Sequence, residues 1–156
     1  MSRKSILLAA AVGLGFFLLW NGCEDDPNDN KRASVISSYG DTDSHHSGEN
    51  CMSCHDGGGS GTGWFKVAGT IYQSDGITPY PNTTVSLYAD AASGGDLEMT
   101  VEVDGNGNFY TTESVSWGIG LVATATSDSD TRTMSSRVTD GACNLCHGVA
   151  AAITLD

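Results

Sequence analysis

Short segments in which apolar and polar residues alternate run through the chain from residue 65 onward. The clearest is 97–103, where every odd position is apolar and every even position is polar or acidic. Side chains of a β-strand point alternately to its two faces, so this segment predicts a strand with one buried and one exposed face. The same reasoning predicts strands at 65–73, 84–88, 109–112, 120–126 and 132–138, with a final apolar stretch at 150–155.

Turn-forming residues separate these segments. Asp-Gly occupies 75–76, and clusters rich in Pro, Asn, Asp, Gly and Ser occupy 79–82, 104–107 and 127–130. No stretch after residue 22 keeps a helical period for three turns. The chain therefore predicts an all-β fold, a sandwich of about seven strands.

Four pieces of this region carry a family resemblance: residues 67–72, 75–76, 81–87 and 104–110. Together they resemble the carboxypeptidase regulatory-like, or prealbumin-like, β-sandwich over roughly residues 66–126. The resemblance implies a scaffold and brings no catalytic residues with it.

The first 22 residues resemble an export signal. Arg3 and Lys4 precede an apolar run, 6–19, that is shorter than the roughly 20 residues a membrane-spanning helix needs. Residues 18–22 before Cys23 resemble a bacterial lipoprotein box, which implies a lipid on Cys23; conventional cleavage, the alternative, leaves a spare thiol there. Glu24 in such proteins permits sorting to the outer membrane, on its periplasmic or cell-surface side.

Two further divisions follow from composition. Residues 23–44 are polar with few apolar side chains and predict a flexible acidic tether, and residues 45–156 form the predicted domain.

The signal holds two of the seven basic residues and none of the nineteen acidic ones, so five basic and nineteen acidic residues remain, a formal charge of −14. Such a surface repels nucleic acid and favours cationic partners.

Two pentapeptides carry the candidate chemistry: Cys51-Met52-Ser53-Cys54-His55 and Cys143-Asn144-Leu145-Cys146-His147. Cys-x-x-Cys-His is the pattern of c-type haem attachment. The two thiols, Cys51 with Cys54 and Cys143 with Cys146, are spaced to reach the two vinyl groups of one porphyrin. The next residue, His55 or His147, then supplies the proximal iron ligand. We therefore expect two covalently bound haems c.

Other chemistries for four cysteines explain less. A thiol–disulfide couple or a structural disulfide leaves both adjoining histidines without a role. A four-cysteine zinc site does the same, and Cys54 and Cys143 are much farther apart than zinc-ribbon spacing allows.

The remaining histidines, His45 and His46, are the candidate distal ligands. Two iron sites bound by two histidines each are allowed by this count, because adjacent residues can point to different irons. Met134 is the alternative distal ligand and would raise the potential of its haem. A ligand from a second copy of the chain, in an oligomer or filament, is a further alternative.

The motifs precede the first strand and the last apolar stretch, so parallel pairing of those two segments would put both haems at one end of the domain. The whole chain resembles small multihaem c-type lipoproteins of bacteria that respire extracellular acceptors. That resemblance implies an electron carrier whose partners are other cytochromes or an extracellular acceptor. A haem enzyme or gas or peroxide sensor with one open iron, and a module whose haems are structural only, are the alternatives.

Overall fold

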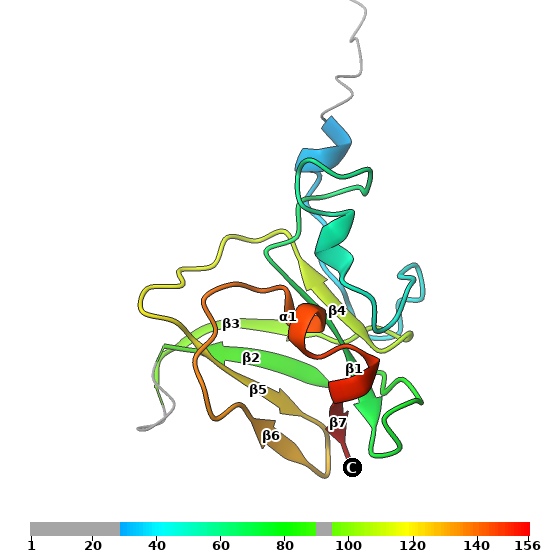
Figure 1. Ribbon diagram of the computed structural model, residues 1–156, viewed down its shortest axis with the longest axis vertical. Coiled ribbons are helices and arrows are strands. Elements are labelled where there is room, and N and C mark those ends of the chain that lie inside the picture. Colours follow the sequence, from blue (N-terminus) through cyan, green and yellow to red (C-terminus); the bar gives the residue numbers. More distant parts are fainter. Residues whose placement is uncertain (1–28, 90–94) are drawn as a thin grey trace, which may run out of the picture.

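Two β-sheets make up most of the molecule. The computed structural model describes residues 29–89 and 95–156 (Figure 1). One sheet has the strand order β4-β1-β7 and the other β3-β2-β5-β6. The strands are β1 (Val67–Gln73), β2 (Thr84–Tyr88), β3 (Leu97–Glu102), β4 (Asn108–Thr111), β5 (Val122–Thr126), β6 (Thr131–Thr133) and β7 (Ile153–Leu155).

Apolar side chains from both sheets meet in one core, which confirms the predicted all-β sandwich. Alternate residues of β2 point into it, as the sequence pattern predicts, and so do Met99 and Val101 of β3. Leu97, predicted on the same buried face, is instead 55% exposed. The ten buried members are Val67, Ile71, Val85, Leu87, Val101, Val103, Phe109, Leu121, Ala125 and Leu155.

Strand β1 is the central support of the three-stranded sheet. Its first half pairs antiparallel with β4, and its second half pairs parallel with β7. The first strand and the final apolar stretch therefore pair in parallel, the condition under which both motifs were expected at one end of the domain. Six of its seven residues are buried, because the second sheet covers one face and short helical turns lie on the other.

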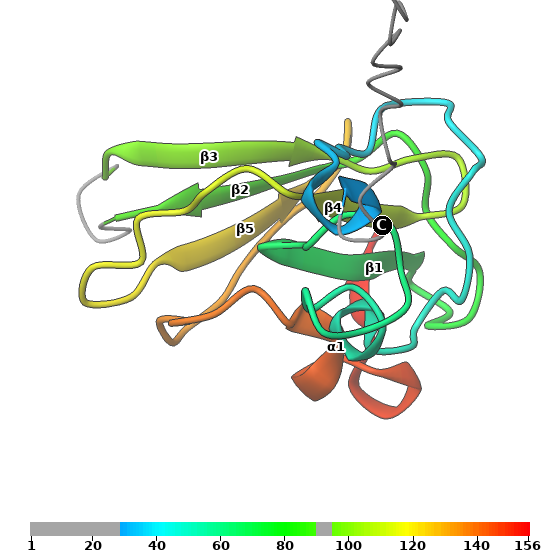
Figure 2. The same cartoon turned by 90° about the horizontal axis from the view of Figure 1, so that it is seen from above.

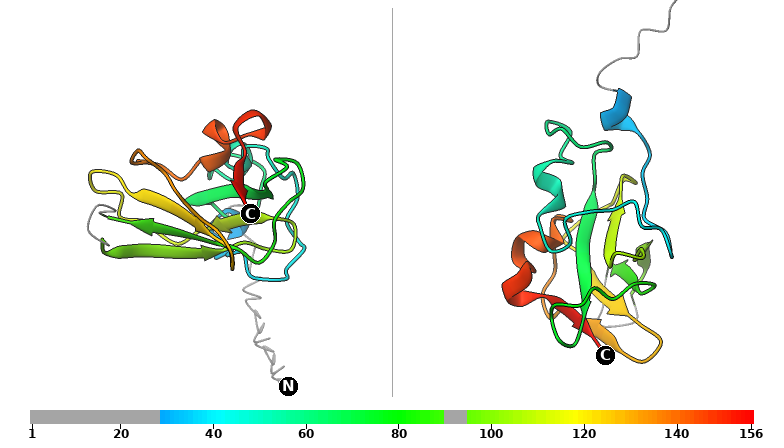
Figure 3. Two further views of the ribbon diagram at one scale, coloured as in Figure 1. Left: turned by 90° about the horizontal axis from the view of Figure 1, so that it is seen from below. Right: turned by 90° about the vertical axis from the view of Figure 1, so that its right-hand side faces the viewer.

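Those helical turns are η2 (Cys51–Ser53), α1 (Cys143–Cys146) and η3 (Val149–Ala151); η1 (Asp29–Arg32) lies near the start of the described chain. Figure 2 shows α1 and β3 on opposite sides of the molecule with β1 between them. In the right-hand view of Figure 3, η2, α1 and η3 all lie on the same side of the domain.

The predicted strand at 132–138 is wrong in its second half. Regular pairing of β6 with β5 spans Thr131–Thr133, and Met134 N still donates to the Ala123 carbonyl. The chain then leaves the sheet and returns only as a single bridge between Val138 and Leu121. Met134 and Val138 thus flank a loop, and the alternation of apolar and polar residues did not predict this loop.

Residues 33–44 lie along the domain, whereas the sequence predicts them as part of a flexible tether. Val35 N donates to Thr112 Oγ1 at 2.9 Å, and Ser37 N donates to the Tyr110 carbonyl at 2.9 Å. Val35 also packs against the small apolar cluster of Phe65, Ala68 and Tyr110, so a few apolar residues suffice to dock this segment. Residues 1–28, with the predicted signal, Cys23 and the first part of the tether, lie outside the described residues.

In the described part of the chain, no helix is long and apolar enough to cross a membrane.

Candidate functional site

The first Cys-x-x-Cys-His motif forms one helical turn that includes η2. The Cys51 carbonyl accepts hydrogen bonds from the backbone N–H groups of Cys54 at 3.2 Å and His55 at 3.0 Å. The side chain of Asn50 accepts from Met52 N at 3.2 Å and caps the start of the turn. Residues three and four apart are neighbours on one face of a helical turn, so the two thiols and the imidazole share a face.

The second motif repeats this local structure in α1. His147 N donates to the Cys143 carbonyl at 2.8 Å, the same contact that His55 makes to Cys51. Cys143, Cys146 and His147 are therefore also placed on one face of a single turn. Two segments far apart in the sequence have folded into equivalent arrangements of two thiols and an imidazole.

Both motif histidines are held through the same ring nitrogen. His55 Nδ1 lies 2.8 Å from the Thr62 carbonyl oxygen, and His147 Nδ1 lies 3.0 Å from that of Ala151. A carbonyl only accepts hydrogen bonds, so these contacts favour the tautomer with hydrogen on Nδ1 and a lone pair on Nε2. Metal-binding histidines are commonly oriented in this way.

The glycine-rich loop 58–63 folds back onto the first motif. Gly61 N donates to the Cys54 carbonyl at 2.9 Å. A Cβ at Gly61 would lie 2.5 Å from His55 Nδ1, so only glycine allows this approach. The Asp56 carboxylate accepts from Gly58 N and Gly59 N, and these hydrogen bonds lower its pKa.

A buried polar network joins the two motifs across β1. Thr70 N donates to Asn144 Oδ1 at 3.0 Å, and Asn144 Nδ2 donates to Thr70 Oγ1 at 3.0 Å and to the Glu49 carbonyl at 2.8 Å. Thr70 Oγ1 in turn donates to Asn108 Oδ1 at 2.7 Å and accepts from Gly48 N at 2.9 Å. One side chain of the second motif thus holds the backbone two residues before the first.

The same network positions the segment that carries the two remaining histidines. Asn108 Nδ2 donates to Ser44 Oγ at 2.9 Å and to the His45 carbonyl at 3.4 Å. Sequence reasoning missed Thr70, Asn108 and Asn144, because nothing in their local sequence distinguishes a buried amide or hydroxyl from an exposed one.

His45 is the ring neighbour of the first motif histidine. The ring centroids of His45 and His55 are 6.2 Å apart, with an angle of 39° between the ring planes. His46 has a positive φ of 54°, and its ring stands edge-on to that of His45 at 84°. His46 is exposed, and its Nδ1 lies 3.4 Å from a Glu49 carboxylate oxygen. The two adjacent histidines therefore take different directions, as predicted.

Three stacked rings connect the first motif to the sandwich. His55 stacks on Phe65 with centroids 4.2 Å apart, and Phe65 stacks on Tyr110 at 4.9 Å. Burial raises the pKa of Tyr110 to about 12, and three nearby aspartates add to this effect. The stack and the Thr62 hydrogen bond together hold the His55 ring.

A cavity of about 730 Å³ adjoins the second motif. Its volume lies within the roughly 300–1,000 Å³ of pockets that enclose cofactors and other small molecules. Core side chains of both sheets form one part of its wall. The second motif contributes Cys143, Cys146 and His147, and the segment 132–140 contributes Met134 among others.

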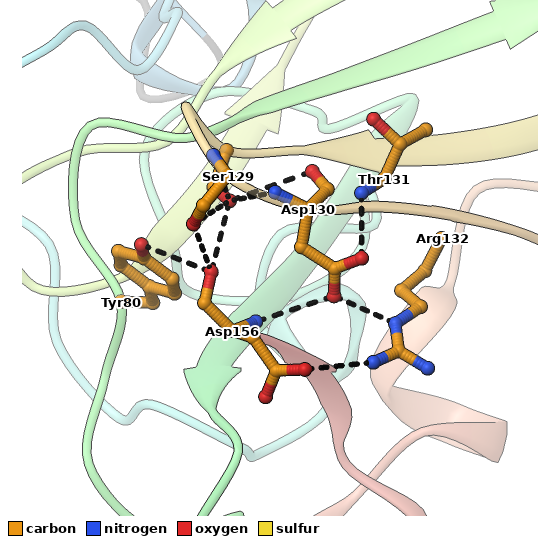
Figure 4. A network of polar contacts seen from close by, with 7 residues as sticks. Tyr80, Ser129, Asp130, Thr131, Arg132 and Asp156 are labelled. Carbon is orange, nitrogen blue, oxygen red and sulfur yellow. Dashed lines mark hydrogen bonds and ion pairs between the residues drawn. The ribbon is translucent and has the colours of Figure 1, made fainter.

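A polar network beside this cavity fixes the end of β7 to β6 (Figure 4). The Asp130 carboxylate accepts from Arg132 Nε at 2.7 Å and from Asp156 N at 3.2 Å. Ser129 Oγ donates to the Asp156 carbonyl at 2.5 Å. The hydrogen bond from Arg132 is the main cause that lowers the pKa of Asp130.

The four motif cysteines are free, and the first of each pair is the more buried. Burial raises the pKa of the Cys51 thiol, and it raises that of Cys143 to about 12, with a smaller contribution from Asp140. These two positions thus favour a neutral sulfur over the thiolate that zinc requires. Within residues 29–89 and 95–156, no three His, Cys, Asp or Glu side chains converge as a metal site.

No family model, no curated protein and no solved structure matches this chain.

Proposed function

We propose that this protein is an exported, membrane-anchored electron carrier that holds two haems c. Cys51 and Cys54 would bind the first haem by thioether bonds, and Cys143 and Cys146 the second. His55 and His147 would be the proximal iron ligands. Each haem, when bound, supplies an iron that takes up and releases one electron.

The observation that carries this proposal is the repeated local structure of the two motifs. In each, one helical turn gathers two thiols and an imidazole, and a backbone carbonyl within hydrogen-bond distance of Nδ1 leaves Nε2 as the ligand. A disulfide framework gives no reason for that shared histidine geometry, and a zinc site would require thiolates at the buried Cys51 and Cys143. A thioether sulfur is also neutral, which suits the buried positions of Cys51 and Cys143.

The spacing of His45 and His55 fits two axial ligands of one iron. A metal–imidazole nitrogen distance of about 2.0–2.1 Å, plus about 1.1 Å from each nitrogen to its ring centre, separates the centroids of two such ligands by about 6.3 Å. The observed separation is 6.2 Å. Axial rings can rotate about their common axis, so the 39° between their planes is compatible with this role. Two histidine ligands favour a low potential and leave no open position for a substrate.

The buried network would keep the two haem-binding segments side by side for electron exchange. Asn144 and Thr70 join the second motif to β1 and to the backbone before the first. Because the contacts are buried and on a strand at the centre of its sheet, they give both sites a common rigid support.

The acidic surface suggests how the carrier meets its partners. A formal charge of −14 beyond residue 22 attracts cationic surfaces of other redox proteins and repels nucleic acid. Lipidation of Cys23 would anchor the chain at the outer membrane, so the partners are other cytochromes or an extracellular electron acceptor. The resemblance to multihaem lipoproteins and to the prealbumin-like sandwich belongs to this proposal.

Carbon monoxide binding to the dithionite-reduced protein tests the electron-carrier assignment. An iron with two protein ligands resists carbon monoxide, so we expect no change in the visible spectrum of the wild-type protein. His45→Ala should open one iron, while His46→Ala serves as the matched control and should behave as the wild type. Binding to the wild-type protein would instead support an enzyme or sensor, for which the cavity beside His147 offers access.

A further inference from the structure

The surroundings of the two motif histidines differ. His55 lies near a second imidazole, that of His45, at a centroid separation of 6.2 Å. His147 lines the 730 Å³ cavity, and neither His45 nor His46 contributes to the wall of that cavity. A symmetrical pair of haem sites, each with two histidines, is therefore not what these residues provide.

The cavity wall contains one thioether that no attachment bond would use, the side chain of Met134. Its backbone is held at the end of β6, where Met134 N donates to the Ala123 carbonyl at 2.9 Å. The side chain is half-buried, and it belongs to the segment 132–140, whereas His147 belongs to the C-terminal segment. The two candidate ligands thus reach one cavity from separate segments of the chain.

Other polar side chains of the wall are engaged elsewhere or are poor ligands for haem iron. Asp140 Oδ1 accepts from Ala142 N at 3.0 Å and forms the turn before the second motif. Arg132 binds Asp130 and Asp156, and a guanidinium has no lone pair to donate. A soft thioether is a known axial ligand of haem iron in proteins.

His46 is a poor competitor for the second iron. Its ring lies beside the Glu49 carboxylate, and its backbone has a positive φ. The second motif is linked to the segment before the first motif by the hydrogen bond from the Asn144 amide to the Glu49 carbonyl. This link brings neither His45 nor His46 into the cavity wall.

We propose that Met134 is the distal ligand of the second iron, so that the protein holds two unequal haems. This inference rests on the proposed function. The site with His45 and His55 would have the lower potential, and the site with Met134 and His147 the higher, because a methionine ligand raises the potential of a haem. An electron entering at the first site would then move downhill to the second, which gives the carrier a direction.

Absorption and redox titration of the purified protein test this assignment. We expect the long-wavelength absorption band of a methionine–ferric haem bond in the wild-type protein, and two separate reduction waves. Met134→Leu should abolish the band, open one iron to carbon monoxide and lower the upper wave. Met99→Leu, at a half-buried methionine on β3, is the control and should leave both features unchanged.

The results separate this inference from the proposed function. Absence of the band in the wild-type protein, or its survival in Met134→Leu, overturns the methionine assignment. Absence of the band in the wild-type protein together with loss of the upper wave in His46→Ala would assign the ligand to histidine instead. Two haems per chain by mass would leave the proposed function standing in each of these cases, and absence of the band in the wild-type protein decides against methionine without any variant.

Discussion

Asn144→Ala removes the side chain that joins the second motif to β1 and to the backbone before the first motif. Asn144 is 5% exposed and makes three hydrogen bonds through its amide. After the substitution, Thr70 Oγ1 keeps two partners, Gly48 N and Asn108 Oδ1. Thr70 N and the Glu49 carbonyl lose the partner that Asn144 supplies.

The expected loss of stability follows from these two groups. A buried donor or acceptor left without a partner costs about 1–3 kcal/mol. Thr70 N is fully buried and belongs at the upper end of that range, whereas water can reach the partly buried Glu49 carbonyl. We expect Asn144→Ala to lower the free energy of unfolding by about 2–4 kcal/mol, a large share of the roughly 5–15 kcal/mol typical of a domain.

Urea unfolding followed by far-ultraviolet circular dichroism measures this loss, on samples matched for haem content. Leu145→Ala is the control because Leu145 is the next residue of the same motif but is 68% exposed. The free energy of unfolding of Leu145→Ala should stay within about 0.5 kcal/mol of that of the wild type. If the two variants unfold at the same urea concentration, the network does not hold the motifs as described.

Two further substitutions test single contacts. The pKa of Asp130 is lowered in the folded protein, mainly by Arg132, so the stabilisation by its carboxylate is present above the unfolded pKa and is lost as pH falls through the folded pKa. Asp130→Asn should therefore reduce the loss of melting temperature that the protein shows as pH falls, whereas Asp128→Asn, which removes the same charge, should not. Equal pH dependence of the melting temperature in the two variants would contradict the argument. Gly61→Ala places a Cβ 2.5 Å from His55 Nδ1 and should cost about 1–3 kcal/mol. It should also alter the electron paramagnetic resonance spectrum of one haem, and an unchanged spectrum would show that the loop is not in contact with this ligand.

The sequence was informative where each contact is local. Residues 84–88 alternate cleanly and form β2 with the predicted bounds. The final apolar stretch also forms a strand, β7, although its pairing with β1 was only one arrangement that the sequence allowed. Spacing alone indicated that the two thiols and the histidine of each motif could act together, but not that each motif forms a helical turn.

Long-range contacts were beyond this reasoning. Whether Asn144 is exposed or joins two motifs depends on Thr70, 74 residues away in the sequence. The docking of residues 33–44 depends on backbone groups at the edge of β4, which no local pattern encodes. The choice between His45 and His46 likewise depends on a left-handed backbone at His46, a conformation that many sequences could adopt.

Peptide mass spectrometry of the purified mature protein tests the central proposal most directly. The account predicts one haem mass on the peptide with residues 51–55 and one on the peptide with residues 143–147, both surviving denaturation and reducing agent. Unmodified cysteines in either peptide, or cysteines that become free on reduction, would contradict it.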